Sequence, residues 1–172
     1  MISKKMISAL NEQIVMEASA SHKYLAMANW CATKGMDGGK DFFLTHSREE
    51  KEHMMRIVDY LWEVDTEAII PALEQPKHNY KNVKEVVEAA YKSEQAVTQS
   101  IYQLVELSLK EKDYQTHNFL QWYVAEQLEE EALMRQVMDK IKLIGQSESA
   151  LYFIDKELSD INAAEAAAER EE

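Results

Sequence analysis

The distribution of helix-breaking residues constrains the fold of this chain more than any other feature. Only four glycines and two prolines occur in 172 residues, and three of the glycines lie within residues 35–39. Both prolines lie within residues 66–82, and we therefore expect no helix there. Sheet proteins need many turns, and this chain lacks the turn residues to make them. We therefore expect an all-α fold with a few long helices.

Helical periodicity divides the chain into four long segments and one short one. The segments are expected at residues 3–34, 40–65, 83–111, 116–144 and 149–161. The three glycines before residue 40 suit a turn, Thr116 suits the N-cap of the fourth helix, and Gly145 suits its end. Two short turns and one long connection predict a four-helix bundle, in which residues 66–82 run the length of the bundle between helices two and three. The bundle domain then covers residues 1–161, and residues 162–172 form an acidic tail, either frayed helix or disordered.

The charge balance restricts the partners that the chain can bind. Acidic residues outnumber basic ones by 31 to 19, for a formal net charge of -12. Such a surface repels nucleic acid and anionic membranes, and it attracts cations. The single cysteine, Cys31, excludes an internal disulfide, and no apolar run is long enough to span a bilayer. We expect a cytoplasmic protein with no nucleic-acid or membrane partner.

Polar residues interrupt the apolar inward-facing positions of the four long helices at a regular spacing. They are Glu17, Glu50, His53, Glu94, Gln127 and Glu130. The last three follow the first three at a constant offset of 77 positions, which suggests two related helix pairs. The pairs at 50/53 and 127/130 have i, i+3 spacing, which puts both side chains on one helix face.

Carboxylates gathered inside a bundle predict a metal site. Like charges and burial raise carboxylate pKa values, and cations of high charge remove that conflict. Four carboxylates and one imidazole could hold two divalent ions, and this ligand set favours iron or manganese over structural zinc. The competing interpretation is that each glutamate lies on a solvated helix face and that the histidine is structural, as is usual for single residues of these types.

Four motifs carry a resemblance to a known family. "LNEQIVMEASASHKYLAMANWC", "EEKEH", "HNFLQWYVAEQLEEE" and "LYFIDKELS" resemble the bacterial non-haem ferritins, within the ferritin-like di-iron carboxylate proteins. The resemblance spans nearly the whole chain. It implies a four-helix bundle with a short fifth helix, assembly into a 24-subunit cage, oxidation of Fe(II) by O2 or H2O2, and storage of ferric mineral inside the cage.

The resemblance also implies roles for individual residues. One iron would be bound by Glu17, Glu50 and His53, and a second by Glu50, Glu94 and Glu130, with Glu50 bridging and Gln127 lining the site. A third iron site, toward the cage interior, would comprise Glu49, Glu126, Glu129 and Glu130. Tyr24 and Trp122 would lie near the centre and could supply electrons, so Tyr24, Glu50 and Glu130 are the expected catalytic residues. For Tyr24, a core aromatic with a bonded hydroxyl is an equally good interpretation of the sequence alone.

The sequence differs from related groups of proteins at positions that restrict its predicted function. Many relatives repeat Glu-x-x-His on the fourth helix, but here that position reads Gln127-x-x-Glu130, which disfavours a haem-binding protein. One cysteine cannot build the iron module of rubrerythrin-like peroxidases. The tail after Ser159 is longer than the resemblance leads us to expect. Two other functions stay open: a structural or binding bundle with solvated acids, and a di-iron oxygenase or peroxidase, for which an oxygenase would need an apolar pocket beside the metals.

Overall fold

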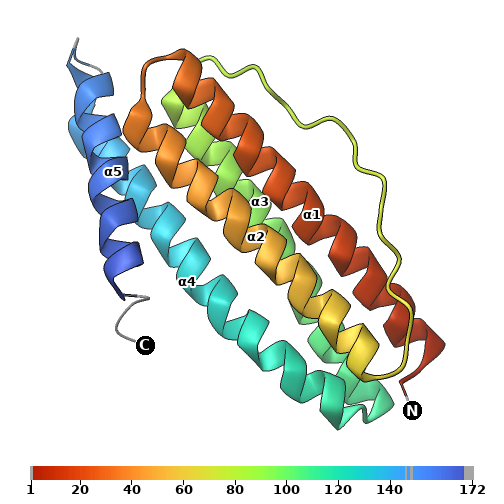
Figure 1. The fold of residues 1–172 in the computed structure, drawn as a ribbon. Helices are drawn as coiled ribbons and strands as arrows, with labels where there is room; N and C mark the ends of the chain where they lie inside the picture. The colour runs from red at the N-terminus through yellow and green to blue at the C-terminus, as the bar shows by residue number, and fades with distance from the viewer. Residues whose placement is uncertain (1, 146, 148, 169–172) are drawn as a thin grey trace.

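The computed structural model describes residues 2–145, 147 and 149–168, and within these ranges it contains five helices and no strand. The helices are α1 (Lys4–Thr33), α2 (Asp37–Glu63), α3 (Val83–Glu111), α4 (Tyr114–Ile144) and α5 (Ala150–Ala168). Figure 1 shows α1 to α4 as a bundle and α5 packed beside α2 and α4 at one end. The predicted all-α bundle with a fifth C-terminal helix is confirmed.

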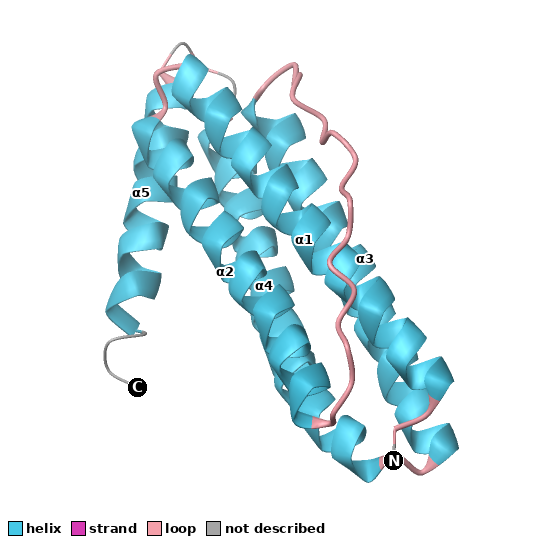
Figure 2. Ribbon diagram, turned by 45° about the vertical axis from the view of Figure 1, so that its right-hand side comes forward, coloured by secondary structure: helices cyan, strands magenta, loops and turns pink. Residues whose placement is uncertain are grey.

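The long connection between α2 and α3 gives the bundle its topology. It follows α1 from one end of the bundle to the other, as the two views in Figures 1 and 2 both show. Two hydrogen bonds attach it to α1: the Ile69 amide donates to Asn11 Oδ1 at 2.7 Å, and Trp30 Nε1 donates to the Tyr80 carbonyl at 3.2 Å. Because the chain returns to its starting end before α3 begins, α2 and α3 run parallel, as predicted.

The apolar core is divided into two clusters along the bundle. One cluster contains Tyr24, Phe43 and Val87, and the other contains Ile14 and Ile57. Glu17 lies between Ile14 and Tyr24 in α1, and Glu50 lies between Phe43 and Ile57 in α2. The acidic positions predicted from periodicity therefore occupy a polar layer between two apolar ones, in the middle of the bundle.

The beginning of α2 differs from the prediction. We predicted a turn at Gly38 and Gly39 and a helix from residue 40, but both glycines lie in the first turn of α2. A Cβ atom on Gly38 would lie 2.2 Å from the backbone oxygen of Asp155 in α5. Gly38 is therefore needed for close helix packing, whereas Gly35, with φ of 72°, makes the turn.

Two other helix ends also differ from the prediction. The N-cap of α4 is Asp113, whose Oδ1 accepts the Thr116 amide hydrogen at 3.1 Å, so Thr116 is not the cap. Asp113 can take this role because Lys112 has left-handed φ of 58°, which turns the chain between α3 and α4. The C-terminal end of α2 falls at Glu63 rather than residue 65, where Asp65 has φ of 55°.

The fifth helix is longer than predicted. It continues past Ile161 to Ala168, so residues 162–168 of the expected tail are helical, and residues 169–172 of that tail lie outside the described residues. The inward positions Ile154, Leu158 and Ile161 are buried against the bundle. Among the described residues, no helix has the length and apolar character needed to cross a membrane.

Candidate metal centre

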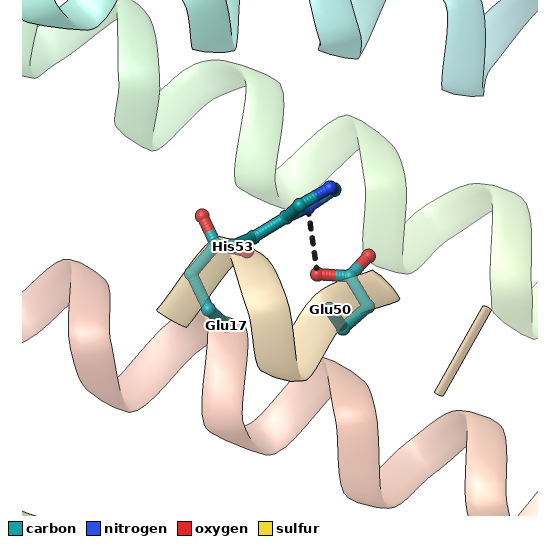
Figure 3. A group of neighbouring side chains, drawn as sticks. All are labelled: Glu17, Glu50 and His53. Carbon is teal, nitrogen blue, oxygen red and sulfur yellow. Dashed lines mark ion pairs between the residues drawn. The ribbon is translucent and has the colours of Figure 1, made fainter. Parts of the chain in front are cut away.

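Three predicted ligands meet where α1 faces α2. Glu17 projects from α1, and Glu50 and His53 project together from α2 because of their i, i+3 spacing (Figure 3). One ligand atom of each residue lies within 4.8 Å of the other two. His53 Nδ1 is 3.6 Å from Glu50 Oε2, which is too long for a direct hydrogen bond.

These three side chains are buried and their hydrogen bonding is incomplete. The exposed fraction is 0% for Glu17, 2% for Glu50 and 7% for His53. Glu17 Oε2, Glu50 Oε2 and His53 Nδ1 have no hydrogen-bond partner within the protein. Leaving such groups buried and unpaired costs free energy, more for a charged group than for a neutral one. A cation coordinated by these atoms would remove that cost, so the site fits a metal ion.

Neighbouring polar groups compensate only part of the negative charge of the Glu17 carboxylate. Gln13 Nε2 donates to Glu17 Oε1 at 2.8 Å, and Ser100 Oγ in α3 in turn donates to Gln13 Oε1 at 2.5 Å. This chain of hydrogen bonds fixes one oxygen of Glu17 and leaves Oε2 without a hydrogen-bond partner. Gln13 was not predicted from the sequence, although it stands one helical turn before Glu17.

The pKa values show how strongly this site resists carrying charge without a metal. Burial raises the pKa of Glu17 to about 7. Burial, together with the nearby charges of Glu94 and Glu17, raises the pKa of Glu50 well above its ordinary value. Burial lowers the pKa of His53 to about 4, so its ring is neutral at pH 7 and can present a lone pair to a metal ion.

Glu94 supplies a further carboxylate from α3. It is completely buried, and it accepts hydrogen bonds from Tyr24 Oη and, at 3.2 Å, from Gln127 Nε2. Gln127 also donates to Thr98 Oγ1 at 3.3 Å. Glu94 and Tyr24 therefore form a buried donor–acceptor pair beside the centre, although Glu94 lies outside the group of ligand atoms within 4.8 Å.

Glu130 belongs to a second group of candidate ligands rather than to the group around Glu17. Its Oε2 lies 3.7 Å from His46 Nε2, and the ligand atoms of His46, Glu49 and Glu130 all lie within 4.8 Å of one another. Burial, followed by the nearby charges of Glu94, Glu49 and Glu165, raises the pKa of Glu130 to about 8, and His46 opposes this rise.

A cavity of about 420 Å³ opens beside this second group. Its lining includes His53, Arg56 and Trp122, with Arg56 4.2 Å from the centre of the Trp122 ring. The remaining lining is mainly acidic: Glu49, Glu52, Glu126, Glu129, Glu130 and Glu165. The four residues predicted for a third iron site are therefore gathered around one cavity.

The structure thus brings the predicted residues together in two places and adds others. Glu17, Glu50 and His53 form one group; Glu94 and Glu130, predicted to share a second iron with Glu50, are not part of that group, although their charges help to raise the pKa of Glu50. His46 was missed because a lone histidine is usually structural, although it stands one turn before Glu50 on the same helix. Glu165 was missed because it lies in a low-complexity tail.

Comparison with known proteins identifies the family. The ferritin-like domain model matches residues 7–144. The chain is 45% identical over 161 residues to the bacterial non-heme ferritin of Campylobacter jejuni, covering 94% of this chain and 96% of that protein. It is 41% identical over 162 residues to the bacterial non-heme ferritin of an Escherichia coli strain, covering 94% and 98%.

Solved structures agree with this result. An open pore ferritin from the archaeon Archaeoglobus fulgidus superposes with a TM-score of 0.90 at 40% identity, covering 92% of this chain and 98% of that chain. Sequence and structural similarity thus extend over nearly the whole chain, including the helices that hold both groups of candidate ligands. The chain is a member of the ferritin family, and bacterial non-heme ferritins are among its relatives.

Proposed function

We propose that this protein is an iron-storage ferritin that oxidises Fe(II) with O2 or H2O2 at the buried centre between α1, α2 and α3. The observation that carries the proposal is the group of Glu17, Glu50 and His53, whose buried atoms have no hydrogen-bond partner within the protein. Iron is the substrate and cargo in this proposal. The proteins to which the chain is similar are named as ferritins, which supports iron as the ion.

We propose for the individual residues the roles that the family resemblance implied. Glu17, Glu50 and His53 would bind the first Fe(II), and Glu50, Glu94 and Glu130 the second, with Gln127 holding Glu94 in place. Glu130 Oε2 lies 3.7 Å from His46 Nε2, so its carboxylate would have to turn toward Glu50 to bind the second ion. Glu49, Glu126, Glu129 and Glu130 would form a third site at the acidic cavity.

The electron balance gives Tyr24 a specific role. Two Fe(II) ions supply two electrons, which with two protons reduce O2 to H2O2 or reduce H2O2 to two waters. Reduction of O2 to water takes four electrons, so a third Fe(II) and an oxidisable side chain would supply the other two. The Tyr24 hydroxyl already donates a hydrogen bond to Glu94, so this carboxylate can accept the phenolic proton when an electron leaves the ring. Trp122, in edge contact with His53 at 5.2 Å between ring centres, is a second candidate donor.

Assembly into a 24-subunit cage is part of the proposal. Several large apolar side chains of the single chain are exposed, among them Ile69, Ile70, Leu128, Leu143 and Tyr152. Symmetric assembly would bury such side chains at subunit contacts. Size-exclusion chromatography with light scattering would test this, and a monomer or dimer at micromolar concentration would contradict a cage.

The structure weakens both alternative functions. A structural bundle with solvated acids requires exposed carboxylates, but Glu17, Glu50 and Glu94 are 2% exposed or less. An oxygenase needs an apolar pocket beside the metals, whereas the cavity next to His53 is lined mainly by acids. A second cavity, lined by apolar residues such as Trp30, Val83 and Ile154 together with several lysines, contains none of the candidate ligands.

Stopped-flow oxidation would test the proposed function. Metal-free protein would be loaded with Fe(II) without oxygen at increasing ratios and then mixed with O2, with ferric absorbance as the readout. We expect a fast phase that saturates near two irons per subunit, followed by slower uptake. Glu17→Ala and Glu50→Ala should abolish the fast phase, and Glu12→Ala, an exposed acid on α1, should leave it unchanged. Fast oxidation in both centre variants would refute the proposal.

A further inference from the structure

A continuous series of aromatic rings leads from the candidate metal centre toward the C-terminal end of α2. Phe119, Trp122 and Tyr123 have i, i+3 and i+4 spacing on α4, which puts their rings on one helix face. From the centre outward, neighbouring ring centres lie 5.2 Å apart for His53 and Trp122, 4.8 Å for Trp122 and Tyr123, 5.6 Å for Tyr123 and Phe119, and 4.0 Å for Phe119 and Tyr60. Because Tyr60 follows His53 by two turns of α2, the series extends roughly 10 Å along the bundle.

The hydroxyl of Tyr60, at the outer end of the series, begins a hydrogen-bonded path to a carboxylate. Thr116 Oγ1 donates to Asp113 Oδ2 at 2.6 Å, so the single hydrogen of that hydroxyl is already used. The Tyr60 hydroxyl, 2.8 Å from Thr116 Oγ1, is therefore the donor in its own hydrogen bond. Thr116 is fully buried, which keeps bulk water away from the pair. A proton that leaves Tyr60 can thus reach Asp113 in two short steps.

Tyr123 lies nearer the centre, but its hydroxyl donates to a much weaker base. It is fully buried, and its hydroxyl donates to the backbone carbonyl of His53 at 2.6 Å. A phenol that has lost an electron becomes strongly acidic, and it stays oxidised as a neutral radical only where a base takes the proton. An amide carbonyl accepts a proton far less readily than a carboxylate does. Tyr123 is therefore suited to pass an electron between its neighbours, and Tyr60 is suited to hold the radical.

The charge beside Trp122 favours moving the radical away from this ring. The Arg56 guanidinium lies 4.2 Å from the centre of the Trp122 ring. Such a cation is attracted to the face of a neutral indole, but it repels an indole that has lost an electron and become positive. A neutral tyrosyl radical whose proton has moved to Asp113 carries no charge to be repelled. Electron transfer from Tyr60 to oxidised Trp122 would remove this repulsion.

We propose that Tyr60 is the terminal electron donor of this series and reduces Trp122 again after Trp122 has given an electron to O2 reduction at the centre. This role rests on the proposed function, which supplies the oxidant. In the step, the O–H bond of Tyr60 breaks, and its electron passes to the Trp122 radical cation. The proton passes to Thr116 Oγ1, whose own proton passes to the Asp113 carboxylate. Trp122 becomes neutral again, and the radical ends on Tyr60, away from the metal ligands.

Radiolytic oxidation of the metal-free protein tests this transfer without iron. Azide radicals would oxidise tryptophan side chains, and time-resolved absorption would follow the decay of tryptophan radicals and the growth of tyrosyl radicals. The exposed Trp62 would be replaced by phenylalanine in every sample, and Trp30 would contribute equally to all of them. We expect Tyr60→Phe to lower the tyrosyl yield to that of Trp122→Phe. Tyr102→Phe, at an exposed position of α3, should keep the full yield, and equal yields in the two tyrosine variants would overturn the proposal.

Thr116→Val tests the proton path while keeping the aromatic series complete. Valine has nearly the shape of threonine but cannot accept the phenolic proton, and Asp113 can still accept the backbone amide hydrogen at position 116. We expect the tyrosyl radical to form about tenfold more slowly in this variant, since the proton acceptor of Tyr60 is lost. Circular dichroism would confirm that the variant is folded. An unchanged rate in folded protein would overturn the path through Thr116.

Repeated iron oxidation separates this role from the proposed function. Tyr60→Phe should keep the rate and extent of the fast phase of Fe(II) oxidation. Oxidation products of Trp122, counted by peptide mass spectrometry after several cycles of Fe(II) and O2, should more than double relative to Tyr102→Phe. Equal amounts of these products would overturn the role of Tyr60 and leave the proposed function intact. No fast phase in the wild-type protein would overturn the proposed function and, with it, the oxidant of this step, whatever the radiolytic result.

Discussion

Replacing Glu17 with glutamine should stabilise the metal-free protein, and should do so more at alkaline than at acidic pH. Burial raises the pKa of Glu17 from 4.5 to about 7, so the folded protein holds this proton more tightly than the unfolded chain does. A raised carboxyl pKa adds no penalty below pH 4.5, and the penalty grows as the pH rises toward 7 and is constant above that. Linkage gives about 1 kcal/mol at pH 5 and about 3 kcal/mol at pH 8.

Glutamine keeps the shape of the side chain and an oxygen that can accept from Gln13, but it carries no charge. Urea unfolding of metal-free protein at pH 5 and pH 8 would measure the difference, with Glu12→Gln as the exposed control on the same helix. Saturating Co(II) should reverse the order at pH 8, because the wild-type site binds the ion more tightly than the variant. Equal unfolding free energies for wild type and Glu17→Gln at pH 8 would refute the reasoning.

Three further predictions concern the reaction, the pH dependence of binding and the core. Tyr24→Phe should keep the number of bound Fe(II) ions but slow oxidation and remove the contribution of Tyr24 to the tyrosyl radical signal in freeze-quenched paramagnetic resonance spectra; an unchanged rate would rule out an electron-donating role. Co(II) affinity should rise from pH 6 to pH 8, because protons on Glu17 and Glu130, with pKa values of about 7 and about 8, compete with the ion. Isothermal titration calorimetry across this range would measure the affinity, and an affinity that does not change with pH would contradict the prediction. Leu120→Ala, at a fully buried position, should cost about 2–5 kcal/mol of unfolding free energy in urea, against a negligible change for Gln121→Ala, an exposed polar position on the same helix.

The sequence was informative about the bundle because the physics involved is local. Helix periodicity places Leu10, Ile14 and Glu17 on one face of α1 without knowledge of the other helices, and all three are buried. The prolines in residues 66–82 located the long connection, since proline removes a backbone donor and clashes within a helix. The end of α4 at Gly145 also followed from chain chemistry, because its φ of 75° suits glycine.

The predicted helix boundaries were wrong at residues whose local chemistry allows two roles, because tertiary packing decided which role they take. Gly38 fits a turn by its backbone freedom, but the backbone of α5 passes so close that a side chain would not fit. The N-cap of α4 is Asp113 rather than the predicted Thr116. Both residues can cap a helix, and the left-handed backbone conformation of Lys112 determines where the turn ends. Local chemistry permits each alternative, and only the neighbouring segments select one.

Part of the candidate site could likewise be predicted from the sequence, and the rest was decided by the packing of the helices. Helical periodicity and i, i+3 spacing were enough to place Glu17, Glu50 and His53 on inward helix faces, because both are local properties of a helix. The grouping of these three residues around one ion was implied by the family resemblance. That Glu130 faces His46, and that Glu165 reaches the same cavity, depended on how α2, α4 and α5 pack together. Contacts between distant segments depend on the rigid placement of whole helices, which the sequence of any one helix does not encode.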